Sequence, residues 1–362
     1  MDRITRTCSL VLGTLLLAAP AGASRPVLPQ SPESLFVGAR AAGMAGDARR
    51  SALLFASLVQ AQPGNAMIAT RAISQAIAAG DLPLALRLAR GRPVEQLSVD
   101  ARLALAADEL GRGRLEAAER LFRAAGESVD LSFLVPFVSA WRSAESRDLS
   151  SALRQLDAVP AQSALGPHVA EQQAFLLLRA RRVAEAGSYV ERALGSAKGR
   201  ERRLRIAFAD AYERAGARDE ALKLLQDDTP VITAARRQLE RGRRLDAAVL
   251  GPADALAELL LGFAIDINRE DERDLPIAMA QIARRADPRN HEAPIVLGML
   301  LAAEGRTDDA VAAFRTVPDE SPFAAQARDA EARALMDAGA KQEALARAQA
   351  WAANDGAPED WA

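Results

Sequence analysis

Cysteine and histidine are nearly absent from this chain of 362 residues, which has one cysteine and two histidines. A disulfide within the chain and a zinc site built from several cysteines are therefore excluded. His291 and Glu292 begin like a zinc-binding helix motif, but Ile295 stands where that motif requires its second histidine. His168 follows Pro167 and is interpreted as the solvated start of a helix. We therefore expect neither a metal site nor a cofactor.

Residues that favour β-sheet are also scarce. Aromatic residues make up 4% of the chain and valine and isoleucine are few, whereas alanine accounts for about a fifth of it. This composition disfavours sheets and favours α-helix. The net charge of -2 produces no overall field that would attract nucleic acid or an anionic membrane surface, and neither is expected as a partner.

Lysine is rare too, and nearly all of the basic residues are arginine. The strongest basic cluster could form a local anion site together with a second group of arginines upstream. Acidic residues are interspersed, however, and no aromatic stacking pattern accompanies the arginines. We interpret the cluster as a solvated repeat edge. Its members are Arg200, Arg202, Arg203 and Arg205, and the upstream group is Arg179, Arg181 and Arg182.

The first 23 residues have the three parts of a signal peptide. Arg3 and Arg6 form a short basic start, residues 9–19 form an apolar core, and Ala21-Gly22-Ala23 supplies a cleavage pattern of small residues. The core is too short for a permanent membrane-spanning helix. We expect cleavage after Ala23 and export to the periplasm, with an uncleaved anchor as the alternative. Cleavage would also remove Cys8, and a chain without thiols suits an oxidising compartment.

A fixed spacing of small residues recurs along the rest of the chain. A small residue is followed seven positions later by glycine and, five positions further on, by alanine or serine. Small side chains let helix axes approach to about 8–10 Å, and glycine can end a helix with a positive φ. The period near 34 residues predicts stacked helical hairpins, an all-α superhelical solenoid. The five clearest sets are Ala39-Gly46-Ser51, Ala106-Gly113-Ala118, Ala209-Gly216-Ala221, Gly298-Gly305-Ala310 and Ala332-Gly339-Ala344.

Turn residues divide the chain into units. The fourth and fifth hairpins are expected to turn near Arg147 and Arg181, where no glycine is present. The tail after the last hairpin reads like the start of another helix, so that the end is either a truncation or a minimal cap. The expected units are a signal peptide (1–23), an extended lead-in (24–31), six hairpins (32–230), an irregular repeat with a longer internal loop (231–290), further regular hairpins (291–354) and a tail (355–362).

The sequence has little that indicates catalysis. Residues 266–277 begin like a calcium-binding loop, but Asp271 stands where glycine is required and Ile277 where glutamate is required. We interpret this stretch as a solvated charged loop. The sequence has no phosphate-binding glycine loop, dinucleotide fingerprint or nucleophile elbow. A protein without enzymatic activity is therefore expected, and an enzyme with scattered carboxylates is the weakest alternative.

The repeated units resemble tetratricopeptide repeats (TPR) over about residues 32–352, and the whole chain resembles exported proteobacterial proteins of this type. The resemblance implies a concave face, lined by the first helix of each hairpin, that receives a peptide or a partner helix. The units that match best contain Ala209, Tyr212, Gly216 and Ala221, and Gly298, Gly305, Ala310 and Phe314. Projection onto that pattern places seven residues toward the groove: Phe137, Trp141, Glu171, Phe175, Arg179, Asp210 and Glu213.

The expected function is a non-catalytic protein–protein interaction scaffold of the bacterial cell envelope. Its partner would be a protein or peptide bound in the concave groove, where aromatic and arginine side chains supply much of the binding energy. The alternative is a structural or assembly subunit of an envelope complex, which would use its edges and ends. A second interpretation of Phe137, Trp141 and Phe175 also stays open, in which these side chains fill the interior between hairpins.

Overall fold

The computed structural model describes residues 31–124, 130–197, 199–267 and 274–355. Within these ranges all regular structure is helical and no strand occurs, which confirms the predicted all-α, TPR-like solenoid. No helix in the described ranges has the length and apolar character needed to cross a membrane. The predicted signal peptide with its cleavage site, most of the charged stretch (residues 268–273) and the tail residue Trp361 lie outside the described residues.

Short turns join most helices into hairpins, and successive hairpins pack side by side. Short 3-10 helices precede α5, α7 and α9: η1 (Val94–Gln96), η2 (Ser132–Leu134) and η3 (Gly166–His168). The first six hairpins are α1 (Pro32–Met44) with α2 (Ala48–Ala61), α3 (Ala66–Ala78) with α4 (Leu82–Ala89), α5 (Val99–Gly111) with α6 (Leu115–Arg123), α7 (Val135–Glu145) with α8 (Leu149–Asp157), α9 (Val169–Arg179) with α10 (Val183–Ser196), and α11 (Glu201–Ala215) with α12 (Arg218–Leu224).

Seven helices follow. The first of them stands without a hairpin partner, because residues 241–251 form a loop where a second helix would be expected. The others form three hairpins. The seven are α13 (Pro230–Glu240), α14 (Pro252–Ile267) with α15 (Asp274–Ala286), α16 (Ala293–Ala303) with α17 (Thr307–Phe314), and α18 (Ala324–Asp337) with α19 (Lys341–Asp355).

The small residues of the repeat lie where helices approach each other most closely. Ala221 and Ala310 are fully buried. A Cβ atom added to Gly298 of α16 would lie 2.4 Å from the ring of Phe314 in α17, well inside van der Waals contact. Glycine at this position therefore lets the phenylalanine ring lie directly against the α16 backbone.

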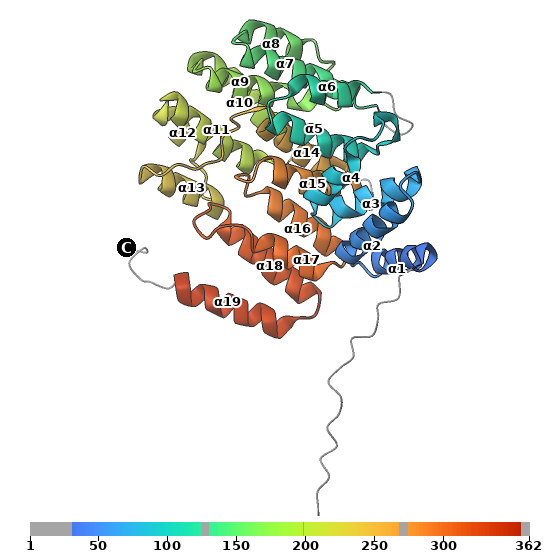
Figure 1. Ribbon diagram of the computed structural model, residues 1–362. Helices are drawn as coiled ribbons and strands as arrows, with labels where there is room; N and C mark the ends of the chain where they lie inside the picture. The colour runs from blue at the N-terminus through green and yellow to red at the C-terminus, as the bar shows by residue number, and fades with distance from the viewer. Residues whose placement is uncertain (1–30, 125–129, 198, 268–273, 356–362) are drawn as a thin grey trace, which may run out of the picture.

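The chain path differs from an open superhelix. The hairpins from α1 to α12, with α13, follow one another around the periphery, and α14 to α16 then lie in the middle of the molecule (Figure 1). There α15 packs against α3 and α5 as well as against its sequence neighbours α14 and α16. Segments nearly two hundred residues apart in the sequence are thereby in contact, and the solenoid is closed on itself.

The sequence of α14 explains why this helix occupies the centre. Every residue from 255 to 264 is buried, including Glu258, so the helix is apolar on nearly all sides. A helix of this kind is stable only when neighbours surround it. At about 25 cal/mol per Å² of apolar surface removed from water, enclosure stabilises α14 far more than one-sided packing would.

Candidate functional site

The structure buries five of the seven residues projected onto the concave groove: Phe137, Trp141, Phe175, Glu171 and Asp210 are each at most 2% exposed. The Phe175 ring packs against Phe208 with centroids 4.8 Å apart. The indole N–H of Trp141 donates to Gln172 Oε1 at 3.0 Å. The aromatic side chains thus lie between helices in the interior, which is the second interpretation given above.

The other two projected residues make local ion pairs; Arg179 is exposed and Glu213 is half-buried. The Arg179 guanidinium lies 5.8 Å from the centre of the Trp141 ring and pairs with Glu145 at 2.9 Å. Glu213 accepts a hydrogen bond from Arg218 at 2.7 Å. The seven residues therefore do not form one open surface.

Asp210 has a structural partner that the sequence did not indicate. Its Oδ2 atom accepts the backbone N–H groups of Ala247 and Ala248 at 2.9 and 2.8 Å, and also bonds Arg214 at 3.0 Å. These contacts hold the loop 241–251, which leads the chain from α13 into the centre. Asp210, which the TPR pattern projects onto the groove, instead anchors the loop that leads to α14, the helix in the centre of the molecule.

A buried cluster of charges joins α9, α11 and α14. It corrects the interpretation of a solvated edge for Arg200 and Arg203, whereas Arg202 and the upstream Arg179, Arg181 and Arg182 are exposed. Arg200 and Arg203 are 4% and 1% exposed. Arg200 pairs with Glu171 at 3.0 Å and with Glu258 at 2.9 Å, and Arg203 donates to Glu258. Burial by itself raises the pKa of the Glu171 carboxyl, but its contacts with Arg200 and His168 outweigh burial and lower that pKa to about 2.

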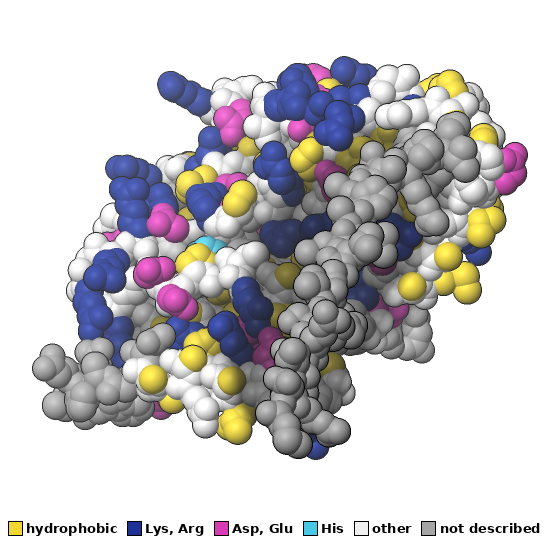
Figure 2. Space-filling model, turned by 60° about the horizontal axis from the view of Figure 1, so that its bottom comes forward, with side chains coloured by type: hydrophobic (Ala, Val, Ile, Leu, Met, Phe, Trp, Pro, Cys, Tyr) yellow, Lys and Arg dark blue, Asp and Glu magenta, His cyan; other side chains and the backbone are white. Residues whose placement is uncertain are grey.

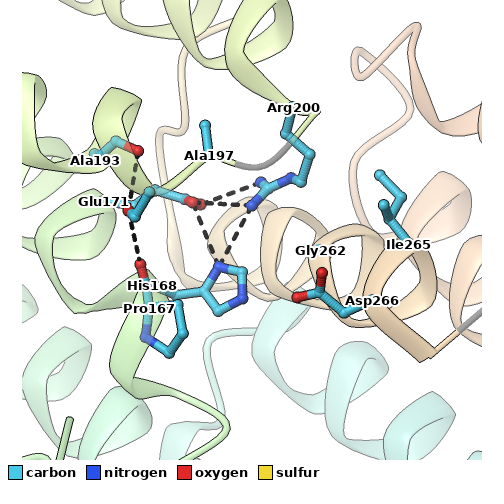
Figure 3. Close-up of a pocket in the computed structure, with 10 residues that line it drawn as sticks. Pro167, His168, Glu171, Ala193, Ala197, Arg200, Gly262, Ile265 and Asp266 are labelled. Carbon is cyan, nitrogen blue, oxygen red and sulfur yellow. Dashed lines mark hydrogen bonds and ion pairs between the residues drawn. The ribbon is translucent and has the colours of Figure 1, made fainter. Parts of the chain in front are cut away.

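His168 belongs to this cluster and is buried, so its interpretation as a solvated helix start is wrong. Its Nδ1 atom lies 3.4 Å from Arg200 Nη1 and 3.5 Å from Glu171 Oε2, and its ring meets Phe263 of α14 edge-on at 5.2 Å (Figure 3). A Cβ atom added to Gly262 would lie 2.5 Å from this ring. Glycine there allows α14 to approach the histidine.

The cavity beside this cluster has a volume of only about 20 Å³, room for a single water molecule. It cannot hold a substrate. The side chains around it are paired with one another rather than turned toward an open space (Figure 3). Removing one partner of such a buried pair costs about 3–5 kcal/mol, because it leaves a charge uncompensated. The cluster therefore ties the central helix to the surrounding ones.

The loop between α15 and α16 contributes the remaining buried polar groups. Asn290 donates to Glu258 Oε1 at 2.9 Å, and Asp287 and Glu292 are buried nearby. Burial raises the pKa of Asp287 to about 6 and that of Glu292 to about 7. Within the described residues, no group of three or more His, Cys, Asp or Glu side chains is arranged to hold a metal ion.

An open groove lies between α13, α16 and α18, and the sequence did not predict it. Its volume is about 850 Å³, within the usual range of ligand-binding clefts. Alanines and one exposed methionine dominate its surface, so its floor is shallow and apolar. Residues that line it include Val231 of α13, Met299, Ala302 and Ala303 of α16, and Ala330 and Ala334 of α18.

The groove escaped prediction because its walls come from distant parts of the chain. The side chains of α16 and α18 belong to the first helices of the last two hairpins, where the TPR resemblance does place a binding face. The opposite wall is α13, whose position depends on the loop 241–251. Met299, an apolar residue that is 58% exposed, is the one local signal on α16.

Charged side chains are distributed rather than gathered on the face shown in Figure 2. Arginine and lysine side chains form several separate groups there, with acidic and apolar side chains between them. A continuous basic stripe, the electrostatic footprint of nucleic-acid binding, is not seen among the described residues of this face.

No protein-family model and no curated protein matches the sequence. Among solved structures, the chain is similar to the TPR domain of P58(IPK), with 15% identity, coverage of 89% of this chain and 92% of that one, and a TM-score of 0.26. It is similar to a chain of the Naa15/Naa10 complex bound to HypK-THB, with 15% identity, coverage of 88% and 57%, and a TM-score of 0.32. It is also similar to yeast Tom70, with 13% identity, coverage of 87% and 89%, and a TM-score of 0.20. Likenesses of this size assign no function to the chain.

Proposed function

We propose that this protein is a non-catalytic interaction scaffold that binds a segment of a partner protein in the groove between α13, α16 and α18. One observation supports the proposal most directly. Most of the superhelix interior is filled by α14 and α15, whereas this groove stays open, is mostly apolar and has the size of a binding cleft. Exposed apolar concavities of this kind are typical of interaction sites.

The cellular setting is also part of the proposal. The basic start, short apolar core and small-residue cleavage pattern in the first 23 residues support export through a cleaved signal peptide. The scaffold would then act in the periplasm as a component of the bacterial cell envelope.

Site-specific photo-cross-linking in intact cells tests the groove. A photoreactive residue at Ala330, on the groove wall, is expected to form an adduct with a defined partner. The same residue at Ala312, exposed on α17 away from the groove, serves as the matched control. A second substitution, Ala303→Trp, fills the groove and should remove the adduct. Equal cross-linking at Ala330 and Ala312, or an adduct that survives Ala303→Trp, would contradict the proposal.

A second candidate is an assembly subunit, and a specific feature of the first hairpins favours it. Five large apolar side chains of α1 to α3 are exposed, among them Val37 at 65% and Met44 at 84%; the other three are Phe36, Leu53 and Met67. An apolar end of this kind suits stacking against another subunit. A photoreactive residue at Val37 in the same experiment separates the two candidates, since an assembly subunit would cross-link there and not at Ala330.

A further inference from the structure

Two hollows flank the loop of residues 90–93, which follows α4. The α2/α4 hollow lies between the loop and the ends of α2 and α4, and its volume is about 420 Å³. The α5/α6 hollow lies between the loop and helices α5 and α6, and its volume is about 250 Å³. Arg90, Gly91 and Arg92 line both hollows, so the loop lies between them. Neither hollow shares a residue with the groove between α13, α16 and α18.

Arginine side chains dominate the charge of the two hollows. Among the residues described, Glu109 is the one acidic residue that lines either hollow. Both of its carboxylate oxygens are bonded by Arg114, so this negative charge is already paired. Four arginines line the hollows: Arg87 in the α2/α4 hollow, Arg120 in the α5/α6 hollow, and Arg90 and Arg92 in both.

The positive charge of these arginines is largely uncompensated. Asp108 pairs with Arg90 at 2.7 Å, but it also pairs with Arg112 at 3.2 Å, so two guanidinium groups share one carboxylate. Within the part of the chain that the structure describes, the other three arginines of the hollows form no ion pair. The hollows therefore carry a local excess of positive charge, although the whole chain has a net charge of -2.

The helix ends at this surface do not cancel that charge. A helix C-terminus carries only about half a negative charge, and arginines already bond the last carbonyl groups here. Near the end of α4, Arg92 Nε donates to the Leu88 carbonyl at 2.8 Å. At the end of α6, the buried Arg102 guanidinium donates to the carbonyls of Leu121 and Ala124 at 3.0 and 2.8 Å. The bond to Leu88 also fixes the Arg92 side chain beside the loop, which lowers the entropy cost of binding a ligand.

The α5/α6 hollow has an apolar floor as well. Leu97, Leu105 and Leu121 line it and are nearly buried, so an apolar side chain that covers them removes further apolar surface from water. None of the described residues that line the two hollows is aromatic. The surface therefore lacks the stacking platforms with which proteins bind single-stranded nucleic acid. Carboxylates next to an apolar side chain suit it better.

We infer that the two hollows form a second binding site, which accepts an acidic segment of a partner protein across the loop 90–93. Aspartate or glutamate side chains of the segment pair with Arg87, Arg92 and Arg120, because a forked guanidinium group binds a carboxylate through two parallel hydrogen bonds. An apolar side chain of the same segment packs on the leucine floor. This site is separate from the groove of the proposed function and is tested independently of it.

Two synthetic peptides of ten residues with blocked ends test the inference. The glutamate peptide has two glutamates on each side of a central leucine, with glycine and serine at the other positions. The glutamine peptide has glutamine in place of each glutamate. Binding to the full chain is measured by fluorescence anisotropy at low ionic strength. We expect the glutamate peptide to bind at least about tenfold more tightly, and added salt to reduce this difference.

Arginine substitutions in the protein locate the site. The double variant Arg87→Gln, Arg120→Gln changes two exposed side chains and should retain the fold, which circular dichroism checks. It should bind the glutamate peptide at least about tenfold more weakly. The control double variant Arg237→Gln, Arg243→Gln removes the same charge at exposed positions outside the hollows and should bind like the wild-type chain. The groove variant Ala303→Trp should also leave this binding unchanged.

The apolar floor has its own test. A glutamate peptide with serine in place of the central leucine should bind at least about threefold more weakly, since it leaves the leucines exposed. Unchanged affinity would contradict the apolar contact.

Several results would overturn the second site. These are equal affinity for the glutamate and glutamine peptides, equal weakening in the two double variants, and no binding of either peptide. A strand of ten thymidine nucleotides that displaces the glutamate peptide and binds more tightly would show a nucleic-acid site instead. The proposed function would still be judged separately, by the cross-links at Ala330.

Discussion

At the scale of single residues, the turns between paired helices show where sequence and backbone disagree. Gly46 and Gly216 have φ values of 78° and 88°, in the left-handed region that glycine enters without strain. Arg147 and Arg181 occupy the equivalent turns of the fourth and fifth hairpins, with φ values of 63° and 57°. Side chains with a Cβ atom are strained in this region, at a cost of about 1–2 kcal/mol. The repeat therefore imposes its turn on residues that disfavour it.

Replacing Arg181 by glycine should therefore stabilise the protein. The change removes the left-handed strain but increases the conformational entropy of the unfolded chain, so we expect a net gain of about 0.5–1 kcal/mol. Urea unfolding followed by circular dichroism measures it. The reverse change at the matched turn, Gly216→Arg, should destabilise the protein. A loss of stability in Arg181→Gly would show that the arginine side chain has a role that outweighs its backbone strain.

At the scale of elements, the loop between α15 and α16 makes stability depend on pH. Asp287 and Glu292 have folded-state pKa values raised by burial to about 6 and about 7. The folded chain therefore binds more protons than the unfolded chain between about pH 4.5 and 7, and stability falls as pH rises through this range. Glu171 has the opposite sign, since its pKa is lowered to about 2 and its contribution is lost only as pH falls below about 4.5. The combined contribution of these three carboxyl groups to stability is therefore greatest near pH 5.

The variant Glu292→Gln tests this dependence, because glutamine resembles the protonated carboxyl. It should be more stable than the wild-type chain at pH 8, by about 1–3 kcal/mol, and similar to it at pH 5. Urea unfolding at pH 5, 6, 7 and 8 gives the comparison. Glu320→Gln, at an exposed position, should follow the wild-type slope. Parallel slopes for Glu292→Gln and the wild-type chain would contradict the expected protonation.

At the scale of the whole molecule, closure changes how the solenoid should unfold. In an open solenoid each repeat contacts only its neighbours, and stability is a sum of local terms. Here α15 also packs against α3 and α5, and Arg306, in the turn after α16, donates a hydrogen bond to the carbonyl of Ala78 at 3.3 Å. The beginning and the later part of the chain are therefore expected to lose structure together.

Hydrogen exchange of the variant Ile282→Ala tests this coupling. Ile282 is buried in α15, and its truncation should cost about 2–5 kcal/mol. Because α15 contacts α3 and α5, amide protection should fall in those helices as well as in α14 and α16. Leu335→Ala in α18, which is buried outside this contact, should leave the protection of α3 and α5 unchanged. Loss of protection confined to α14 to α16 would show that the closure contributes no stability.

The sequence by itself determined the hairpins, because their signals are local. Small residues at Ala221 and Ala310 and turn glycines such as Gly216 act within about one repeat, where spacing alone predicts contact. Only the tertiary structure decided what fills the superhelix and what stays open. The burial of Glu171, the pairing of Arg200 with Glu258, and the groove beside α18 all depend on where α14 and α13 lie. α14 lies at the centre because it is apolar on nearly all sides and is stable only when neighbours enclose it. Those neighbours come from segments too distant in the sequence for any repeat spacing to specify.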